Sequence, residues 1–258
     1  MIVGMYTSAS GMLAQAARHD TIANNLANVS TPGFKADAVM MSEHPKQFLH
    51  RLSDNLFNFK GFVADPAPAI GSRGQGTMID SILPNFKQGT IINTENKFDV
   101  ALMGSGWFTI STLRGRRFTR AGNFSLDSMG RLVTRSGDPV LSSTGAEIVV
   151  GAKRLDINKA GDIYLDGDEA GKLAVVIPSD SGMLVKEGES LYSPAAGARF
   201  GQADCEVVQG SIEGSNVNAM LGMAEMLEAL RAYEANQRAI QAQDETLNRL
   251  ISEVGRFG

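Results

Sequence analysis

The stretch from Ser215 to Gly258 has the most regular hydrophobic pattern in the chain, and it predicts one long α-helix over residues 217–254. Its apolar residues recur every seven positions, in a file made of Ala219, Met226, Tyr233, Ile240, Leu247 and Val254. A second file, offset by four positions, is polar in its middle and consists of Met223, Leu230, Gln237, Asp244 and Ile251. Spacings of seven and four place both files on one stripe of a helix. At about 1.5 Å per residue the helix is roughly 55 Å long, which is typical of a coiled-coil element that needs a partner.

Residues 1–30 predict a second helix, which has little charge. Its seven-residue repeat gives one file of Ile2, Ala9, Ala16 and Ala23 and another of Met5, Met12, His19 and Leu26. Arg18 and Asp20 are the only charged residues in this range. A helix of small, uncharged residues suits close contact on several sides, so we expect it to pair with residues 217–254 in antiparallel or near-axial fashion. A buried helix of a single globular domain is the alternative that this pattern leaves open.

The middle of the chain predicts strands. Residues 36–70 have no clean periodicity and are interpreted as a connecting segment. From residue 71 to residue 210 short apolar runs alternate with turn residues, which is typical of an antiparallel β domain, and Trp107 and Phe108 are expected in its core. No ten-residue helical pattern intervenes, which excludes repeated βαβ units.

The predicted fold class is therefore mixed α and β. Long N- and C-terminal helices are expected to pair as a coiled-coil-like terminal domain, and the central domain is expected to be mostly antiparallel β. The predicted divisions are the N-terminal helix with its turn at residues 1–35, the connecting segment at 36–70, the β domain at 71–210 and the C-terminal helix at 211–258.

Composition narrows the class of partner. The 258 residues carry a formal net charge of −4, which argues against a general nucleic-acid or anionic-membrane binder. Cys205 is the single cysteine, so no intramolecular disulfide and no cysteine metal cluster is expected. No apolar run approaches the roughly 20 residues that span a bilayer. The first positive side chain is Arg18, so no Sec-type signal peptide is expected, and these features alone would indicate a cytoplasmic protein.

No motif predicts catalysis. The sequence lacks a nucleophile elbow, a His-Glu-x-x-His motif and a dinucleotide-binding glycine pattern between a strand and a helix. The acidic segment from Asp156 to Glu169 partly matches a calcium loop, but Ala160 and Gly167 stand where ligands are required, so we expect a hairpin with acidic turns. We therefore predict no catalytic residue, no metal site, no cofactor and no small-molecule substrate.

Three motifs resemble those of the bacterial flagellar rod, hook and hook-associated protein family. The first runs from Ala23 to Lys35 and contains Asn24, Asn25, Leu26, Asn28, Pro32, Gly33 and Phe34. The second runs from Phe118 to Phe124 and continues at Gly130–Val133. The third runs from Glu213 to Asn218 and continues at Arg231–Glu234. They occur in the family's order and bracket nearly the whole chain.

The resemblance implies a non-enzymatic structural subunit of the flagellar basal-body rod. Many copies would pack their helix pairs side by side into a tube, with the β domain outside and the weakly charged first helix in the crowded inner layer. The implied partners are copies of the chain, other rod subunits, hook or ring components of the basal body and the flagellar export apparatus. The residues expected at the assembly interface are Met5, Met12, Asn24, Asn25, Leu26, Asn28, Pro32, Gly33, Phe34, Ser215, Asn216, Val217, Met226, Leu230, Tyr233, Ile240 and Leu247.

Within the family the chain resembles proximal-rod subunits of the FlgF type more than distal-rod subunits of the FlgG type. The segments that carry this preference are Gly104–Phe108, Ile212–Asn216 and Leu250–Arg256. The family is exported through the flagellum's own channel without a cleaved signal, which implies a periplasm-spanning rod rather than the cytoplasm. The competing interpretation is a self-contained module whose β domain binds a ligand.

Overall fold

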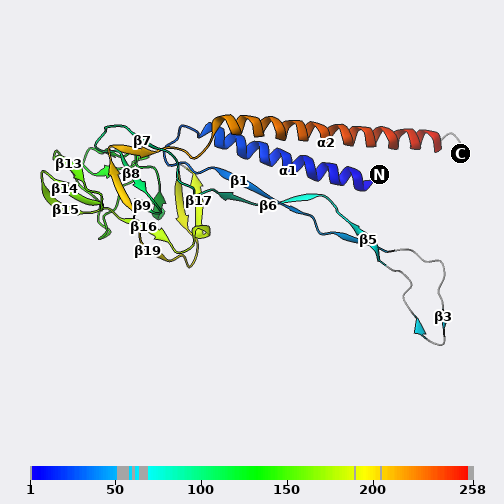
Figure 1. Ribbon diagram of the computed structural model, residues 1–258, viewed down its shortest axis with the longest axis horizontal. Helices are drawn as coiled ribbons and strands as arrows, with labels where there is room; N and C mark the ends of the chain where they lie inside the picture. Colours follow the sequence, from blue (N-terminus) through cyan, green and yellow to red (C-terminus); the bar gives the residue numbers. More distant parts are fainter. Residues whose placement is uncertain are drawn as a thin grey trace. The chain divides into compact units, whose positions relative to one another are not determined.

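The computed structural model describes residues 2–50, 58–59, 62–63, 69–188, 190–203 and 205–254 (Figure 1). The chain forms two compact units. The first comprises Met1–Ala23, Ala38–Leu83 and Met220–Gly258, and the second comprises Asn24–Asp37 and Pro84–Ala219.

Two long helices run side by side in the first unit (Figure 1). Helix α1 spans Ile2–Ala27 and helix α2 spans Ala219–Val254, which confirms both predicted helices. A Cβ atom added at Gly4 would lie 2.8 Å from the amide of Gln243, and one added at Gly11 would lie 3.1 Å from the amide of Asn236. Further along α1, seven residues after Gly11, Arg18 forms an ion pair with Glu228 at 3.4 Å. Positions rise along α1 as they fall along α2, so the pair is antiparallel.

The contact face of α2 differs from the predicted one. Met226, Tyr233, Ile240 and Leu247 are half-buried, as the first file requires, but the second file is exposed. Met223, Leu230 and Ile251 are 50%, 44% and 69% exposed. Their place is taken by the file three positions after the first, Ala229, Asn236 and Gln243, in which Ala229 is 0% exposed. The glycines of α1 bring the two backbones so close that small or slender side chains fit better than the larger apolar ones.

A two-stranded ribbon completes the first unit. Its strand pairs are β1 (Asp37–Glu43) with β6 (Thr77–Pro84), β2 (Gln47–His50) with β5 (Ala69–Arg73) and β3 (Asn58–Phe59) with β4 (Phe62–Val63). It contacts α1 at Ser10, whose Oγ accepts a hydrogen bond from the Thr77 amide at 3.3 Å. Residues 36–70 were interpreted as a connecting segment and the β domain was expected from residue 71, whereas residues 38–83 belong to the first unit. Most described ribbon positions are exposed, so no one-sided hydrophobic alternation marks these strands.

The second unit is a set of small β-sheets. The neighbouring strands within each sheet pair in antiparallel fashion, as predicted. The largest sheet has the order β17 (Leu184–Gly188), β18 (Leu191–Pro194), β10 (Gly115–Thr119), β9 (Trp107–Thr112), β16 (Val175–Pro178) and β19 (Phe200–Gln202). A three-stranded sheet consists of β13 (Leu155–Ile157), β14 (Asp162–Leu165) and β15 (Asp168–Lys172). The remaining pairs are β7 (Ile91–Asn93) with β21 (Ser211–Glu213), β8 (Val100–Met103) with β20 (Glu206–Gln209) and β11 (Ser125–Leu126) with β12 (Leu132–Val133). A short 3-10 helix, η1 (Ser181–Met183), precedes β17.

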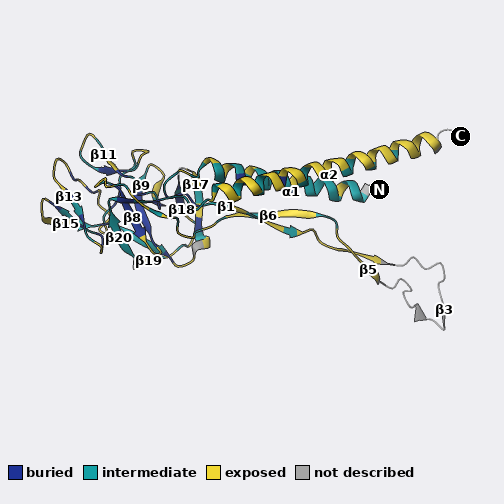
Figure 2. Cartoon of the chain, turned by 45° about the horizontal axis from the view of Figure 1, so that its top comes forward, coloured by how far each residue is buried: buried dark blue, intermediate teal, exposed yellow. Residues whose placement is uncertain are grey.

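Strand β9 separates two apolar clusters. Phe108 is 0% exposed and packs in the larger cluster with residues such as Val100 and Leu132, while Trp107, 5% exposed, packs in the smaller one with Tyr192. Neighbouring residues of a strand point to opposite faces, so these two aromatics serve both clusters. Their predicted core position is confirmed, and Figure 2 shows the buried residues concentrated in strands such as β8, β9 and β18.

Among the described residues, neither long helix contains an apolar stretch long enough to cross a membrane.

Candidate functional site

Asparagines of the first motif end helix α1. The Asn28 amide donates to the carbonyls of Asn24 and Asn25 at 3.2 and 3.1 Å, and its side-chain amide donates to the Asn24 carbonyl at 2.9 Å. The Thr31 hydroxyl then donates to Asn28 Oδ1 at 3.2 Å. Such side-chain bonds compete with the next helical turn, which is why the helix ends at Ala27.

Asn25 ties this last turn to the segment that leads into the ribbon. Its Nδ2 donates to the Asp37 carbonyl and its Oδ1 accepts from the Asp37 amide, both at 2.8 Å. One side chain therefore satisfies both backbone polar groups of Asp37, as a paired strand would.

Gly33 occupies a position that no other residue fits without rearrangement. Its φ is +67°, and a Cβ atom there would lie 2.3 Å from the backbone nitrogen of Ala121. Its amide donates to the Glu213 carbonyl at 2.7 Å. The turn after Pro32 thus presses the first motif directly against the second and third.

Phe34 anchors the exit from this turn. It is 4% exposed, and the ammonium of Lys186 lies 4.0 Å from the centre of its ring. Lys186 also donates to the Lys35 carbonyl at 3.0 Å and to Asp37 Oδ2 at 2.8 Å. A cation over an aromatic face is stabilising, so one side chain of strand β17 makes two contacts with the first motif and a third with Asp37 just after it.

Asn216 connects three stretches of chain. Its Oδ1 accepts from the Ala36 amide at 2.8 Å, and its Nδ2 donates to the carbonyls of Asn85 and Lys87 at 2.7 and 3.0 Å. Beside it, Ser215 Oγ accepts from the Val217 amide at 3.3 Å, just before α2 begins.

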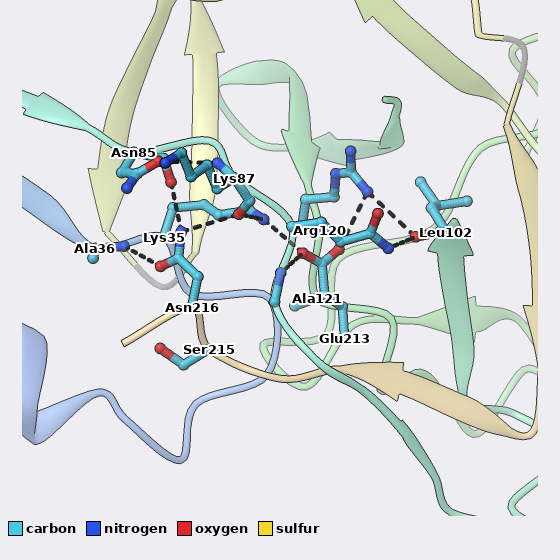
Figure 3. Close-up of polar contacts among 12 residues, drawn as sticks. Lys35, Ala36, Asn85, Lys87, Leu102, Arg120, Ala121, Glu213, Ser215 and Asn216 are labelled. Carbon is cyan, nitrogen blue, oxygen red and sulfur yellow. Dashed lines mark hydrogen bonds and ion pairs between the residues drawn. The ribbon is translucent and has the colours of Figure 1, made fainter. Parts of the chain in front are cut away.

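Three buried charges lie at the centre of these contacts (Figure 3). Lys35 Nζ donates to Glu213 Oε1 at 2.5 Å, and Arg120 Nη1 donates to Glu213 Oε2 at 3.2 Å. The Gly89 amide gives Oε1 a further bond at 2.9 Å, and Lys35 Nζ also reaches the Lys87 carbonyl at 2.8 Å. We call Lys35, Arg120, Glu213 and Asn216 the junction; all four belong to the second unit.

The junction has two cations, Lys35 and Arg120, for the one carboxylate of Glu213. Backbone carbonyls supply further hydrogen-bond acceptors for Arg120. Arg120 Nη2 donates to the Gly104 carbonyl at 2.7 Å, and the guanidinium lies 5.5 Å from the centre of the Trp107 ring. Burial lowers the pKa of Lys35 and of Arg120, and Glu213 opposes that effect on both. Because breaking a buried ion pair leaves an uncompensated charge, each member depends on the other two.

Comparison with known proteins matches these same segments. Residues 5–35 match the family described as "Flagella basal body rod protein", residues 101–165 match "Flagellar hook protein FlgE/F/G D1 domain", and residues 208–253 match "Flagellar basal body rod FlgEFG protein C-terminal". Over 276 aligned positions the chain is 31% identical to the flagellar hook-basal body complex protein FlhO of Bacillus subtilis, and the alignment covers 100% of both chains. The chain belongs to the flagellar basal-body rod protein family.

Relatives of both rod types are similar to this rod-family chain. The flagellar basal-body rod protein FlgF of Caulobacter vibrioides is 27% identical, with 98% of both chains covered. The flagellar basal-body rod protein FlgG of Agrobacterium fabrum is 31% identical, with 92% of this chain and 94% of that protein covered. These relatives are structural rod proteins, not enzymes.

The junction draws one charged residue from each of the three matched regions of this rod-family chain. Lys35 ends the first, Arg120 lies in the second and Glu213 lies in the third. All three lie within the motifs of the sequence, from which no role was predicted for them. A charge inside a motif otherwise built of small and apolar residues was the available signal, but nothing in the sequence showed that the three charges meet.

The structure places the expected interface residues in three groups. Those that contact other parts of the second unit are Asn25, Asn28, Gly33, Phe34, Ser215 and Asn216. In the first unit, the half-buried ones are Met5, Met12, Met226, Tyr233, Ile240 and Leu247, and Leu230 is 44% exposed. Of the rest, Asn24 is exposed and Leu26, Pro32 and Val217 are half-buried. The signature residues around the turn thus hold a single chain together.

The junction can position chain segments but is closed to substrates. Lys35 and Glu213 are each 1% exposed, so no small molecule in solvent reaches their charged groups. Its chemistry is that of a structural joint.

Proposed function

We propose that this chain is a proximal-rod subunit of the FlgF type that polymerises through α1 and α2 into the axial shaft of the flagellar basal body. Its partners are further copies of the chain and other rod subunits, and then hook, ring and export components of the same organelle. The observation that carries the proposal is the apolar surface left on the outer side of the helix pair.

Helix α2 presents an exposed apolar stripe, and its last member, Leu230, also borders a groove lined by residues of α1 such as Ala16 and His19. Met220, Met223, Leu227 and Leu230 are 82%, 50%, 56% and 44% exposed. Their spacing of three, four and three positions places them on one face of the helix. Figure 2 shows the exposed residues extending along α2. Contiguous exposed apolar surface of this kind is typical of protein interfaces.

Helix α1 carries the second part of this surface. Tyr6 and Leu13 are one heptad apart and are 69% and 71% exposed. Two other sides of α1 are already covered, by α2 at Gly11 and by the ribbon at Ser10. A neighbouring copy that covers the third side would enclose a helix with almost no charge, and burial of each large apolar side chain contributes about 1.5–3 kcal/mol.

The proximal assignment rests on sequence features within the family. The segment Gly104–Phe108 contains Trp107, where the distal type more often has phenylalanine. Relatives named FlgF and FlgG have similar identity, so identity alone does not separate the two types. The test is complementation: the gene is expected to restore rod assembly in a strain that lacks its own FlgF-type subunit and not in one that lacks its FlgG-type subunit. The reverse result would assign the distal type.

We further propose that the chain reaches the periplasm-spanning rod without losing an N-terminal signal. Mass measurement of the protein recovered from purified basal bodies is expected to match the full-length chain. A product shortened at its N-terminus would contradict this route.

Assembly through the helices is tested by charging the stripe. In Leu227→Asp/Leu230→Asp, two carboxylates replace exposed leucines, so the monomer keeps its fold while the interface loses apolar contact. The matched control is Ala235→Asp, which adds a carboxylate to an exposed position of α2 outside the stripe. We expect the double variant to lose sedimentable polymer and the control to retain it, with equal helix content by circular dichroism. Equal polymer in both variants would contradict assembly through this stripe.

A further inference from the structure

The second unit carries a basic edge formed by exposed arginines. Arg114 lies in the turn between β9 and β10, Arg116 lies on β10 and Arg135 lies in the turn after β12. All three are exposed, and none of their guanidinium groups forms an ion pair or a hydrogen bond among the described residues. The charge of Arg114 helps to lower the pKa of Glu187, whose carboxylate is ion-paired with Arg117. Leu113, at the tip of the first turn, is 108% exposed. We call these four residues the basic edge.

A groove beside the basic edge contains an unpaired buried hydroxyl. The groove has a volume of about 700 Å³ and is lined by residues that include Thr31, Asn123, Arg135 and Ser190. Ser190 is 4% exposed, and its Oγ has no hydrogen-bond partner in the described part of the chain. A second groove of about 340 Å³ is lined by Arg114, Arg117 and Glu187 and shares Asp138 and Leu191 with the first. Arg114, Arg135 and the Ser190 hydroxyl therefore line two adjoining grooves. A hydroxyl without a partner is costly unless something else bonds it.

The same unit carries an acidic hairpin with the opposite charge. Asp166 lies in the turn between β14 and β15, Asp168 and Glu169 begin β15, and all three are exposed. Other carboxylates of this region form ion pairs: Asp156 pairs with Arg154, Asp162 with Lys172 and Glu206 with Lys159. Asp166 accepts only the Arg154 backbone amide, at 3.0 Å, and no ion pair to any of the three is found among the described residues.

We propose that the acidic hairpin of one copy docks in the groove at the basic edge of the next copy. This inference rests on the proposed function, because it names the contact that the β units make when copies assemble. Carboxylates of the hairpin meet Arg114, Arg116 and Arg135, and the Ser190 hydroxyl donates to one of them. The two surfaces are different patches of one chain, so the contact is head-to-tail and leaves a free patch at each end for further copies.

Charge reversal tests the contact, and mixing makes the test specific. The first variant reverses the basic edge and is Arg114→Glu/Arg116→Glu/Arg135→Glu. The second reverses the hairpin and is Asp166→Lys/Asp168→Lys/Glu169→Lys. Each alone juxtaposes like charges, so we expect its association to weaken by about tenfold or more at low salt. In an equimolar mixture each reversed surface meets an opposite charge on the other variant, so association is expected to return.

A matched control separates this effect from a change in net charge. Lys97→Glu/Lys153→Glu/Arg199→Glu reverses three exposed cations of the same unit away from the groove, and its association is expected to equal that of the unmodified chain. The unmodified contact is expected to weaken as ionic strength rises from about 0.1 to 1 M, where the screening length falls from about 10 to 3 Å. Association is measured by sedimentation velocity on full-length protein.

The outcomes distinguish this inference from the proposed function. If the unmodified chain polymerises and the reversed variants polymerise equally well, the docking contact is wrong and assembly through the helices stands. If the variants are weakened but their mixture is not restored, the contact is also wrong. If the unmodified chain does not associate at all, the proposed function fails and this contact fails with it. Disulfide capture between Arg135→Cys and Asp168→Cys chains, each in a Cys205→Ser background, gives a second readout: failure to form the mixed dimer during polymerisation would overturn the contact.

Discussion

Lys35 and Glu213 form a buried ion pair across 178 positions of sequence, and each side chain is 1% exposed. The same carboxylate bonds Arg120, so it links the first and last motifs of the chain to the middle one. A pair this far apart in sequence closes a long loop. Lys35, Arg120 and Glu213 share one site that is buried from solvent. The stability of the second unit therefore depends on a single anion.

Removal of that anion is expected to destabilise the second unit strongly. In Glu213→Gln the shape is kept, but Lys35 and Arg120 are left as two buried cations without a counter-charge. Loss of one partner of a buried ion pair costs about 3–5 kcal/mol in free energy of unfolding. Urea unfolding followed by the fluorescence of Trp107, which lies 5.5 Å from the Arg120 guanidinium, measures this change.

The control for this prediction is Glu187→Gln. Glu187 pairs with Arg117 at 2.7 Å, but their side chains are 28% and 12% exposed. Water compensates part of that loss, so a cost of about 1 kcal/mol or less is expected. Equal losses in the free energy of unfolding for the two glutamate substitutions would show that burial does not make the junction more important for stability.

Gly33→Ala is expected to destabilise the chain more than an alanine at another glycine with positive φ. Gly33 has a φ of +67° and no room for a Cβ atom, which would lie 2.3 Å from the Ala121 nitrogen. Gly137 has a φ of +91° and nothing within 4 Å of its added Cβ. Gly137→Ala thus reports backbone strain alone, about 1–2 kcal/mol, and the excess in Gly33→Ala reports the clash. Thermal unfolding of both variants gives the comparison; identical midpoints would mean that the turn rearranges without cost.

Stability is expected to fall in acid through three partly exposed carboxylates. Hydrogen bonds from the Arg131 backbone, from the Asn158 side chain and from the Arg117 side chain lower the pKa of Asp127, Asp162 and Glu187, respectively, below the ordinary values of 3.8, 3.8 and 4.5. A lowered folded-state pKa means that the unfolded chain takes up protons first as the pH falls. The stabilisation is present above about pH 4.5 and is lost as the pH falls through the folded-state values.

The measurement is the midpoint of urea unfolding between pH 7 and pH 2. The variant Asp127→Asn/Asp162→Asn/Glu187→Gln is expected to show a shallower decline than the unmodified chain, because it lacks these three titrations. An equally steep decline would assign the acid sensitivity to other carboxylates.

The helix pair is expected to separate when its close approach is blocked. Gly11→Leu places a side chain where the Asn236 amide lies 3.1 Å from the added Cβ, so α1 must move away from α2. Gly222→Leu enlarges a glycine of α2 that has open space around it. Because leucine favours helix over glycine by up to about 1 kcal/mol, the second variant should gain stability and the first should lose it. Far-UV circular dichroism during heating follows both, and a gain in both variants would show that the glycine contact is not needed.

The sequence predicted the helices because their seven-residue pattern is long and uninterrupted. It placed the second contact file of α2 incorrectly because hydrophobicity favours Met223 and Leu230, whereas the contact is set by glycines on the other helix. A spacing rule on one helix contains no information about how close its partner comes. The outward stripe is the result, and it is the feature that supports assembly.

The other differences have related physical causes. The ribbon lacked a signal because most of its described positions are exposed, so its strands show no alternation between a dry and a wet face. No sequence pattern predicted the junction, because Lys35, Arg120 and Glu213 are far apart in sequence and charged residues are usually exposed. Each of them lies in a motif, so a search for charges inside small, apolar motifs would have found the candidates but not their pairing.

The wide spacing of the junction also sets an order of events for a chain that emerges from its N-terminus. Lys35 and Arg120 appear early, but their counter-charge is carried by Glu213, at the end of strand β21, close to the start of α2. Until about five-sixths of the chain has emerged, the second unit cannot close its polar centre without leaving two cations unpaired, so it gains its final stability late. The contact that completes the polar centre is therefore the one of longest sequence separation, and contacts of this kind form late because a long loop must close first.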